Sequence, residues 1–339
     1  MKKLKIAIVG CGRISVSYAD SFRRLADEIE LVYAVDKVPE RAKQFADEFG
    51  CAWTTDFDEI LDKEIDVVHL CLPHFLHPVM AIKAMKAGIN VLTEKPIAIS
   101  LQDADRMLAV QKETGVKLGC IFQTRYTKSV EKLKEMIARG DFGKILTARS
   151  YLTWNRPLDY YDGSDWKGTW DKEGGGVVID QAIHSLDLAN WIIDSEPVEI
   201  QSSLHNRNHK CMIVEDSAEG LIKYKNGALL SFYAMNNYLI DEPIEIRLLC
   251  ENGKATFSYD KAIIEFNDGR VETVNNMPQK IVSYSGGKDY WGTQHAVQIR
   301  QFYRSVMGLE ELEISGREAL KIQNIVCQIY NNNDNKLVH

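Results

Sequence analysis

An aspartate and a histidine stand four residues apart in a segment that opens with three glycines. This segment, Gly174–Leu188, has apolar residues at three- and four-residue steps, which predicts a helix with one apolar face. Asp180 and His184 fall on the neighbouring stripe, one turn apart, so both side chains can point at the same spot. A carboxylate and an imidazole in this arrangement can transfer a proton near neutral pH. The alternative is that Asp180 caps or solvates the helix and His184 is a half-buried structural histidine.

A lysine offers a second group with chemistry. Glu94-Lys95-Pro96 directly follows Asn90–Thr93, which the sequence predicts to be a strand. A lysine at the carboxyl end of a parallel strand faces the crevice in which such sheets bind ligands. The proline fixes the backbone after it and allows a cis peptide bond. The alternative is that Lys95 is a solvated surface charge.

The N-terminal residues predict a turn that binds a dinucleotide. Leu4–Val9 predicts a strand, and GCGRIS follows it as the turn into a helix. Gly10 permits a tight turn, and Gly12 lets a pyrophosphate approach the backbone at the helix N-terminus. Ser15 takes the place of the third glycine of this motif and is still small enough for close packing of helix on strand.

An acidic residue ends the second predicted strand, Leu31–Asp36. A carboxylate at this point of the fold can hydrogen-bond the ribose 2′-hydroxyl of NAD and would repel the 2′-phosphate of NADP. Asp36 therefore favours NAD, while Lys37 beside it leaves NADP as the alternative cofactor. A helix cap for the segment that begins at Pro39 is the alternative role of Asp36.

Strands and helices alternate through the first third of the chain, which predicts a parallel, doubly wound sheet with its ligand at the carboxyl edge. Within it, Cys71, His74 and His77 resemble a metal-binding spacing, but Pro73 and Pro78 break any common helix. We expect no metal there and instead a loop that lies along the nicotinamide ribose.

An aromatic loop, Trp154–Glu173, precedes the three glycines. Aromatic rings can stack on the apolar face of a sugar, although they can also pack on one another or on a partner subunit. Three basic residues against five acidic ones in this loop form no basic cluster for phosphates. A small neutral sugar or cyclitol is therefore favoured over a nucleotide sugar.

Seven alternating runs between residues 198 and 274, with Asn-Gly and Asp-Gly turns between them, predict an antiparallel meander without parallel crossovers. Such a sheet needs a cover on its second face, and we expect self-association, as a homodimer or homotetramer, to supply it. His205, His209 and Cys211 lie nearby, but no fourth metal ligand is within reach, so we expect no metal there either.

The totals set outer limits. A chain of 339 residues accommodates two domains, and 45% hydrophobic with 26% charged residues is typical of a soluble globular protein. Its 41 basic and 48 acidic residues argue against a nucleic-acid partner. Seven scattered cysteines without a CxxC pair favour the reducing cytoplasm. The apolar run at the N-terminus is too short for a signal peptide, and no segment is apolar enough to cross a membrane.

In their order along the chain, these motifs resemble those of the Gfo/Idh/MocA oxidoreductases, which include glucose-fructose oxidoreductase and inositol 2-dehydrogenase. The resemblance covers nearly the whole chain, and the EKP tripeptide followed by GGG-x3-D-x3-H is specific to this family. The chain departs from the family pattern at Ser15 and at His74, where an asparagine is common. The resemblance implies a Rossmann domain over residues 1–123. It also implies an α/β domain with a large, open, mostly antiparallel sheet over residues 124–339.

The resemblance also implies the reaction. Family members transfer a hydride between NAD(P) and a secondary hydroxyl of a sugar, amino sugar or cyclitol, and they use a lysine, an aspartate and a histidine at that hydroxyl. Here these are Lys95, Asp180 and His184. We expect His184 to be the general base, Lys95 to stabilise the developing alkoxide, and Asp180 to orient the substrate; the opposite choice of formal base stays open.

The expected binding residues form two sets. The cofactor is expected to contact Gly10, Gly12, Arg13, Ile14, Asp36, Leu72, Pro73, His77, Glu94 and Lys95. The substrate is expected to contact Arg125, Tyr126, Trp154, Trp166, Asp180 and His184. Two other functions remain: a relative that keeps NAD bound and drives glycoside cleavage or elimination, and a regulator that senses dinucleotide without turnover.

Overall fold

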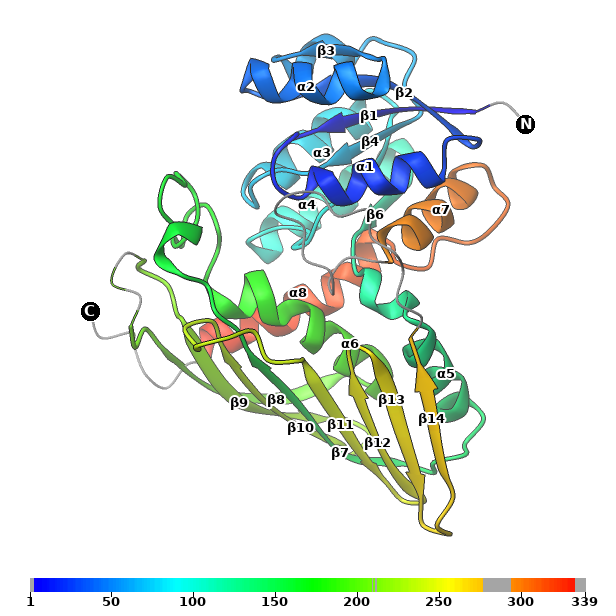
Figure 1. Ribbon diagram of the computed structural model, residues 1–339, viewed down its shortest axis with the longest axis vertical. Coiled ribbons are helices and arrows are strands. Elements are labelled where there is room, and N and C mark those ends of the chain that lie inside the picture. The colour runs from blue at the N-terminus through cyan, green and yellow to red at the C-terminus, as the bar shows by residue number, and fades with distance from the viewer. Residues whose placement is uncertain (1–2, 209, 211, 277–293, 333–339) are drawn as a thin grey trace. The chain divides into compact units, whose positions relative to one another are not determined.

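The computed structural model describes residues 3–208, 210, 212–276 and 294–332. These residues form two compact units, one within 1–123 and 279–321 and the other within 124–278 and 322–339 (Figure 1). Of the three residues that suggested a second metal spacing, His209 and Cys211 lie outside the described residues. No helix in the described part of the chain is long and apolar enough to span a lipid bilayer.

The first unit is built on a six-stranded parallel sheet of order β3-β2-β1-β4-β5-β6. This confirms the predicted doubly wound fold, whose ligands bind where the strand order reverses, here between β1 and β4. The strands are β1 (Leu4–Val9), β2 (Ile29–Val35), β3 (Ala52–Thr54), β4 (Val67–Leu70), β5 (Asn90–Thr93) and β6 (Leu118–Cys120). The helices of this unit are α1 (Ser15–Arg24), α2 (Pro39–Phe49), α3 (Leu76–Lys86), α4 (Leu101–Thr114) and α7 (His295–Val306), with the 3-10 turn η1 (Phe57–Ile60).

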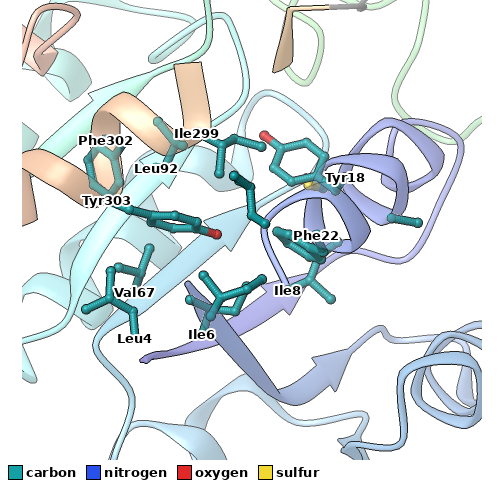
Figure 2. Close-up of a cluster of buried hydrophobic side chains, with 14 of the residues drawn as sticks. Leu4, Ile6, Ile8, Tyr18, Phe22, Val67, Leu92, Ile299, Phe302 and Tyr303 are labelled. Carbon is teal, nitrogen blue, oxygen red and sulfur yellow. The ribbon is translucent and has the colours of Figure 1, made fainter. Parts of the chain in front are cut away.

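Helix α7 packs into the core of the first unit, among residues that are distant from it in sequence. Figure 2 shows Ile299, Phe302 and Tyr303 among apolar side chains of β1, α1 and β4. The hydroxyl of Tyr303 lies 2.8 Å from Nε2 of His69 on β4, and burial lowers the pKa of His69 to about 3. The sequence analysis places all residues after 123 in one domain, whereas the structure places α7 in the first unit. The amphipathic pattern of α7 does not indicate which core the helix joins.

The second unit is built on an eight-stranded sheet of order β14-β13-β12-β11-β7-β10-β9-β8. All of its neighbouring strands are antiparallel except β7 and β10, which are parallel. The strands are β7 (Ile145–Thr153), β8 (Pro197–His205), β9 (Ser217–Tyr224), β10 (Leu229–Met235), β11 (Glu245–Cys250), β12 (Gly253–Ser258), β13 (Lys261–Phe266) and β14 (Val271–Asn275).

The predicted meander is therefore wrong in one respect: it contains no parallel strands, whereas β7 and β10 pair in parallel. Strand β7 inserts between β10 and β11, with Tyr151 beside Tyr233 of β10 and Glu245 of β11. A long segment that contains the aromatic loop and a helix separates β7 from the later strands. Its length allows β7 to pair in the middle of the sheet. Sequence spacing gives no sign of this, because it shows only neighbours along the chain.

Helices lie along one face of this sheet (Figure 1). Helix α5 (Lys128–Ala138) packs on β13 and β14, and α6 (Ile183–Ile193) packs on β7. The C-terminal turn of α8 (Gly316–Asn331) is fastened to β8, because Ser202 Oγ donates a hydrogen bond of 2.6 Å to the carbonyl oxygen of Ile329. The remaining short turns are η2 (Gln123–Tyr126), η3 (Leu158–Tyr160) and the π-helical turn η4 (Val178–Ala182).

Candidate active site

The glycine turn after β1 has the shape that a dinucleotide needs. Gly10 has φ +98°, and a Cβ atom there would overlap the carbonyl oxygen of Cys71. A Cβ on Gly12 would meet no atom within 4 Å, so the backbone at Gly12 is open to an approaching group. Ser15 is buried and donates from Oγ to the carbonyl oxygen of Gly12 at 2.6 Å, as a small residue in the third position should. The turn therefore fits a pyrophosphate at the start of α1.

Asp36 ties this turn to the end of β2. Its Oδ2 accepts from the backbone amide of Cys11 and its Oδ1 from that of Val38, both at 2.8 Å. The second bond closes a turn before α2 and does not cap that helix, whose N-cap residue is Val38. A carboxylate has about four lone-pair sites, so two backbone bonds leave capacity for ribose hydroxyls. The buried carboxylate at this point fits NAD.

Glu94 lies at the centre of a buried polar group. Its Oε1 accepts from the hydroxyl of Tyr18 at 2.9 Å and lies 3.3 Å from Nε2 of His295 on α7. Burial opposes ionisation of Glu94, but the hydrogen bond and charge of His295, with Lys95 and Tyr18, outweigh it and lower the pKa of Glu94. A negative charge is thus held directly before Lys95, which is half-buried and joined to Pro96 by a cis peptide bond.

His77 connects two loops at the edge of the sheet. Its Nδ1 lies 2.7 Å from the carbonyl oxygen of Pro96, and its Nε2 lies 2.9 Å from that of Leu72. Burial lowers the pKa of His77, although both carbonyls favour its protonation. Both ring nitrogens are thus engaged by the loops that carry Lys95 and Pro73. Among the described residues no three His, Cys, Asp or Glu side chains are arranged to hold a metal ion.

The other expected cofactor residues lie around this edge. Arg13 is exposed in the glycine turn, and Ile14 packs on the core as α1 begins. Leu72 and Pro73 are half-buried directly after β4, followed by the buried His74.

In the second unit, the segment with Asp180 begins as a π-helical turn rather than an ordinary α-helix. The turn η4 (Val178–Ala182) runs into α6, which begins at Ile183. A π-turn is wider than an α-turn and often occurs at functional sites. Asp180 lies within η4, and His184 lies buried in the first turn of α6.

Three donors converge on one oxygen of Asp180. Oδ2 accepts from the hydroxyl of Tyr160 at 2.8 Å and from Nε2 of Gln181, and it lies 3.6 Å from Nζ of Lys167. Lys167 also sits 3.7 Å from the centre of the Tyr160 ring, a cation–π geometry. The carboxylate of Asp180 is therefore held in place by one cation and two neutral donors, with its side chain 9% exposed.

Two buried glutamates lie close to this segment. Burial, and after it the negative charge of Asp180, raises the pKa of Glu173 to about 8. Burial also raises the pKa of Glu215 to about 7, although hydrogen bonds from the backbone at Val178 and Gly176 and from Tyr330 counteract it.

Arg125 forms a two-point ion pair inside the second unit. Its Nε and Nη2 lie 2.8 and 2.5 Å from the two carboxylate oxygens of Asp187, one turn after His184. Both side chains are buried, and the guanidinium also lies 5.3 Å from the ring of Trp191. Arg125, with the buried Tyr126 beside it, thus fastens the start of the second unit to α6.

The aromatic loop packs largely on its own unit. Trp154 is buried and donates from Nε1 to the carbonyl oxygen of Glu242 at 3.1 Å, while Arg156 covers its ring at 4.6 Å. Trp166 is half-buried, with Nζ of Lys167 4.9 Å from its ring. Of the two tryptophans expected to contact substrate, Trp166 is the more accessible.

Comparison with known proteins now identifies the family. A family profile described as "Oxidoreductase family, NAD-binding Rossmann fold" matches residues 4–122, and the GFO/IDH/MocA C-terminal domain matches residues 130–256. The chain belongs to the Gfo/Idh/MocA family. The resemblance inferred from the motifs is confirmed, as is an NAD-binding oxidoreductase fold.

Three relatives of this Gfo/Idh/MocA protein show which proteins it is similar to. A myo-inositol 2-dehydrogenase of Thermotoga maritima is 27% identical over 91% of this chain and 86% of its own length. A 1,5-anhydro-D-fructose reductase of Ensifer adhaerens is 28% identical over 60% of this chain, and the match spans only 61% of that relative. The WlbA dehydrogenase of Chromobacterium violaceum, solved with NADH and UDP-GlcNAcA, is 28% identical with a TM-score of 0.87, covering 98% of this chain and 94% of that one.

Sequence reasoning passed over four residues of the Gfo/Idh/MocA chain that contact the Asp180 segment: Tyr160, Lys167, Glu215 and Tyr330. In the sequence, Tyr160 and Lys167 are one ring and one charge among several in the aromatic loop. A tyrosine and a lysine beside a carboxylate are recognisable only once the loop is folded. Glu215 and Tyr330 carry no local motif, since their partners are backbone amides distant in sequence.

The two glycines of the turn after β1 give a matched test of cofactor binding. Gly12→Ala adds a methyl group where nothing is in contact, so the protein should fold with wild-type stability. Its Kd for NADH should nevertheless rise about tenfold or more, since the methyl group occupies the approach of the pyrophosphate. Gly10→Ala should instead destabilise the fold by about 1–3 kcal/mol or more, through backbone strain and overlap with Cys71. NADH fluorescence titration and denaturant unfolding measure the two effects. Wild-type affinity in Gly12→Ala contradicts the assignment of this turn.

Proposed function

We propose that this protein oxidises or reduces a secondary hydroxyl of a small sugar, amino sugar or cyclitol, with NAD as its hydride partner. The observation that carries the proposal is the set of groups around Asp180 and His184. Asp180 is a carboxylate held by three donors, and His184 is a buried imidazole four residues later on the same helical segment. This segment belongs to an NAD-binding oxidoreductase. The names of the relatives support the substrate class, since they include an inositol dehydrogenase and a reductase of an anhydro sugar.

NAD, held by the glycine turn and Asp36, would supply the hydride acceptor for the carbon that bears the hydroxyl. His184 takes the hydroxyl proton and returns it in the reverse direction. Lys95 donates a hydrogen bond to the same oxygen and stabilises the negative charge that develops there. The buried carboxylate of Glu94 places a negative charge next to Lys95. Asp180 accepts a hydrogen bond from the substrate, and Tyr160 and Lys167 keep its carboxylate oriented for that purpose.

Within this class, a small neutral sugar or cyclitol without phosphate is the favoured substrate. The cations of the aromatic loop are already engaged within the loop's own unit. Lys167 faces Asp180, Arg156 lies 3.0 Å from Asp241, and Lys172 donates to the carbonyl oxygen of Asp165. Binding a diphosphate would require breaking such pairs, at the cost of leaving the partly buried carboxylates of Asp180 and Asp241 without their cations. The engaged cations therefore favour an uncharged substrate over a nucleotide sugar such as the UDP-GlcNAcA in the solved complex of the WlbA dehydrogenase.

A screen of uncharged sugars and inositols against NAD and NADP, read by absorbance of the reduced cofactor, tests the proposal. We expect net NADH formation with at least one polyol, and a preference for NAD because Asp36 repels a 2′-phosphate. A relative that keeps its cofactor bound and cleaves glycosides would give product without net NADH. A regulator would bind NAD and turn over nothing. A UDP-sugar as the sole substrate would contradict the uncharged class.

The roles of Lys95 and His184 can be tested in the same assay. Lys95→Ala and His184→Ala should each lower kcat on the order of 10²–10⁴-fold, the range for loss of one acid–base or electrostatic group. NAD affinity should change little in His184→Ala. Because both residues act on one oxygen, the double variant should lose less than the product of the two single losses. A wild-type kcat in either single variant would contradict the catalytic role assigned to that residue.

We also propose that copies of the chain associate through the open face of the eight-stranded sheet. Tyr151 of β7 and Leu249 of β11 are 41% and 50% exposed on strands that pair with each other. Leu249→Glu should shift the mass measured by light scattering toward the monomer. Leu309→Glu, at a similarly exposed leucine of the first unit, should not. A wild-type monomer at high concentration contradicts the proposal.

A cytoplasmic location is supported by the six described cysteines, none of which forms a disulfide; cell fractionation checks it.

A further inference from the structure

We propose that Glu215 and Tyr330 are positioning residues that hold the start of the helix carrying Asp180 and His184 in its reactive shape. The inference deepens the proposed function of that pair and rests on it. Neither residue belongs to a motif, and neither is expected to touch the substrate.

The first N–H groups of any helix have no carbonyl partner within the helix and need another acceptor. Here four consecutive amides, those of residues 176 to 179, point to only two residues. Gly176 N donates to Glu215 Oε2 at 2.9 Å, and Val178 N donates to Oε1 at 3.0 Å. Val177 N donates to the carbonyl oxygen of Glu215 at 3.1 Å.

Tyr330 completes the set. Ile179 N donates to its hydroxyl oxygen at 3.2 Å, and that hydroxyl donates to Glu215 Oε1 at 2.9 Å. The next amide, Asp180 N, bonds to the carbonyl oxygen of Gly176 at 3.0 Å, which is the first hydrogen bond of the helix itself. The residue proposed to bind substrate thus lies directly after the last amide that the two positioning residues hold.

The glycines before the helix make this contact close. A Cβ atom on Gly175 would overlap the hydroxyl of Tyr330, and one on Gly176 would overlap the carbonyl oxygen of Glu215. Gly175 also has φ +143°, which side chains rarely adopt. Two of the three glycines are therefore explained by the approach of Glu215 and Tyr330, rather than by flexibility.

Both partners are themselves fixed. Glu215 is fully buried, and it precedes Asp216, whose carboxylate holds the neighbouring loop through the amides of Arg207 and Asn208. Tyr330 lies in the last turn of α8, next to Ile329, which is bonded to β8. Its ring also meets that of Trp170 edge-on at 5.2 Å. A π-turn is less stable than an α-turn, so an external acceptor for each of its leading amides favours this geometry.

Tyr330→Phe removes one oxygen atom and tests the inference. The amide of Ile179 loses its acceptor, so we expect kcat to fall about tenfold while the Kd for NAD stays within twofold. Tyr224→Phe is the matched control. Tyr224 is a buried tyrosine of the same unit on β9, away from the helix start, and its loss should change stability without changing kcat. Equal kcat in the two variants, measured well below both Tm values, overturns the inference.

A second readout does not depend on activity. Amide hydrogen exchange should be faster for the peptide containing Val178, Ile179 and Asp180 in Tyr330→Phe than in wild type or in Tyr224→Phe. If wild type has no dehydrogenase activity, the proposed function fails, and exchange alone decides whether Tyr330 holds these amides. If Tyr330→Phe does not fold, Glu215→Gln replaces it. Its amide offers one acceptor oxygen where two are used, so the same loss of kcat and faster exchange are expected. Unchanged exchange overturns the inference in either variant.

Discussion

The helix that carries Asp180 and His184 begins in the interior of its unit, where water cannot satisfy the first backbone amides. A buried carboxylate and a buried hydroxyl, from Glu215 and Tyr330, take their place. Most other features of this region follow from that need. The glycines allow the close approach, α8 is fastened to β8 so that it can deliver Tyr330, and the pKa of Glu215 rises to about 7 because the acceptor has to be buried. Burial of this ionisable group costs desolvation free energy, and its hydrogen bonds to the backbone explain why it is kept there.

Much of the architecture could be predicted because it depends on local pattern. Burial on both faces produces the continuous apolar run of β1, and the turn after it needs glycine at position 10 for steric reasons. Alternation and Asn-Gly turns predict the strands β8 to β14, since each hairpin is closed by its own residues. The position of Asp36 directly after β2 could be predicted as well, whereas its contact with the ribose stays a prediction.

The remainder depends on which distant segments meet, and a single sequence does not record this. Helix α7 has an apolar face that suits either core, and β7 has no signal for a parallel partner. At the site, Arg125 and Trp154 have the residue types of sugar-binding groups, yet the fold engages them with Asp187 and Glu242. Lys167 and Tyr160 could not be predicted as site residues, because a lysine and a tyrosine in a polar loop are common. Their role is visible only from their contacts with the carboxylate of Asp180.

The return of α7 to the first unit has a consequence for how the chain is made. The two units are interleaved along the sequence, so the nucleotide-binding unit lacks Ile299, Phe302 and Tyr303 until residues 124–278 of the second unit have been synthesised. Until then, the side chains of β1 and α1 that α7 covers face water (Figure 2). The nascent first unit thus presents an apolar surface while the second is being translated, a period in which chaperone binding competes with aggregation.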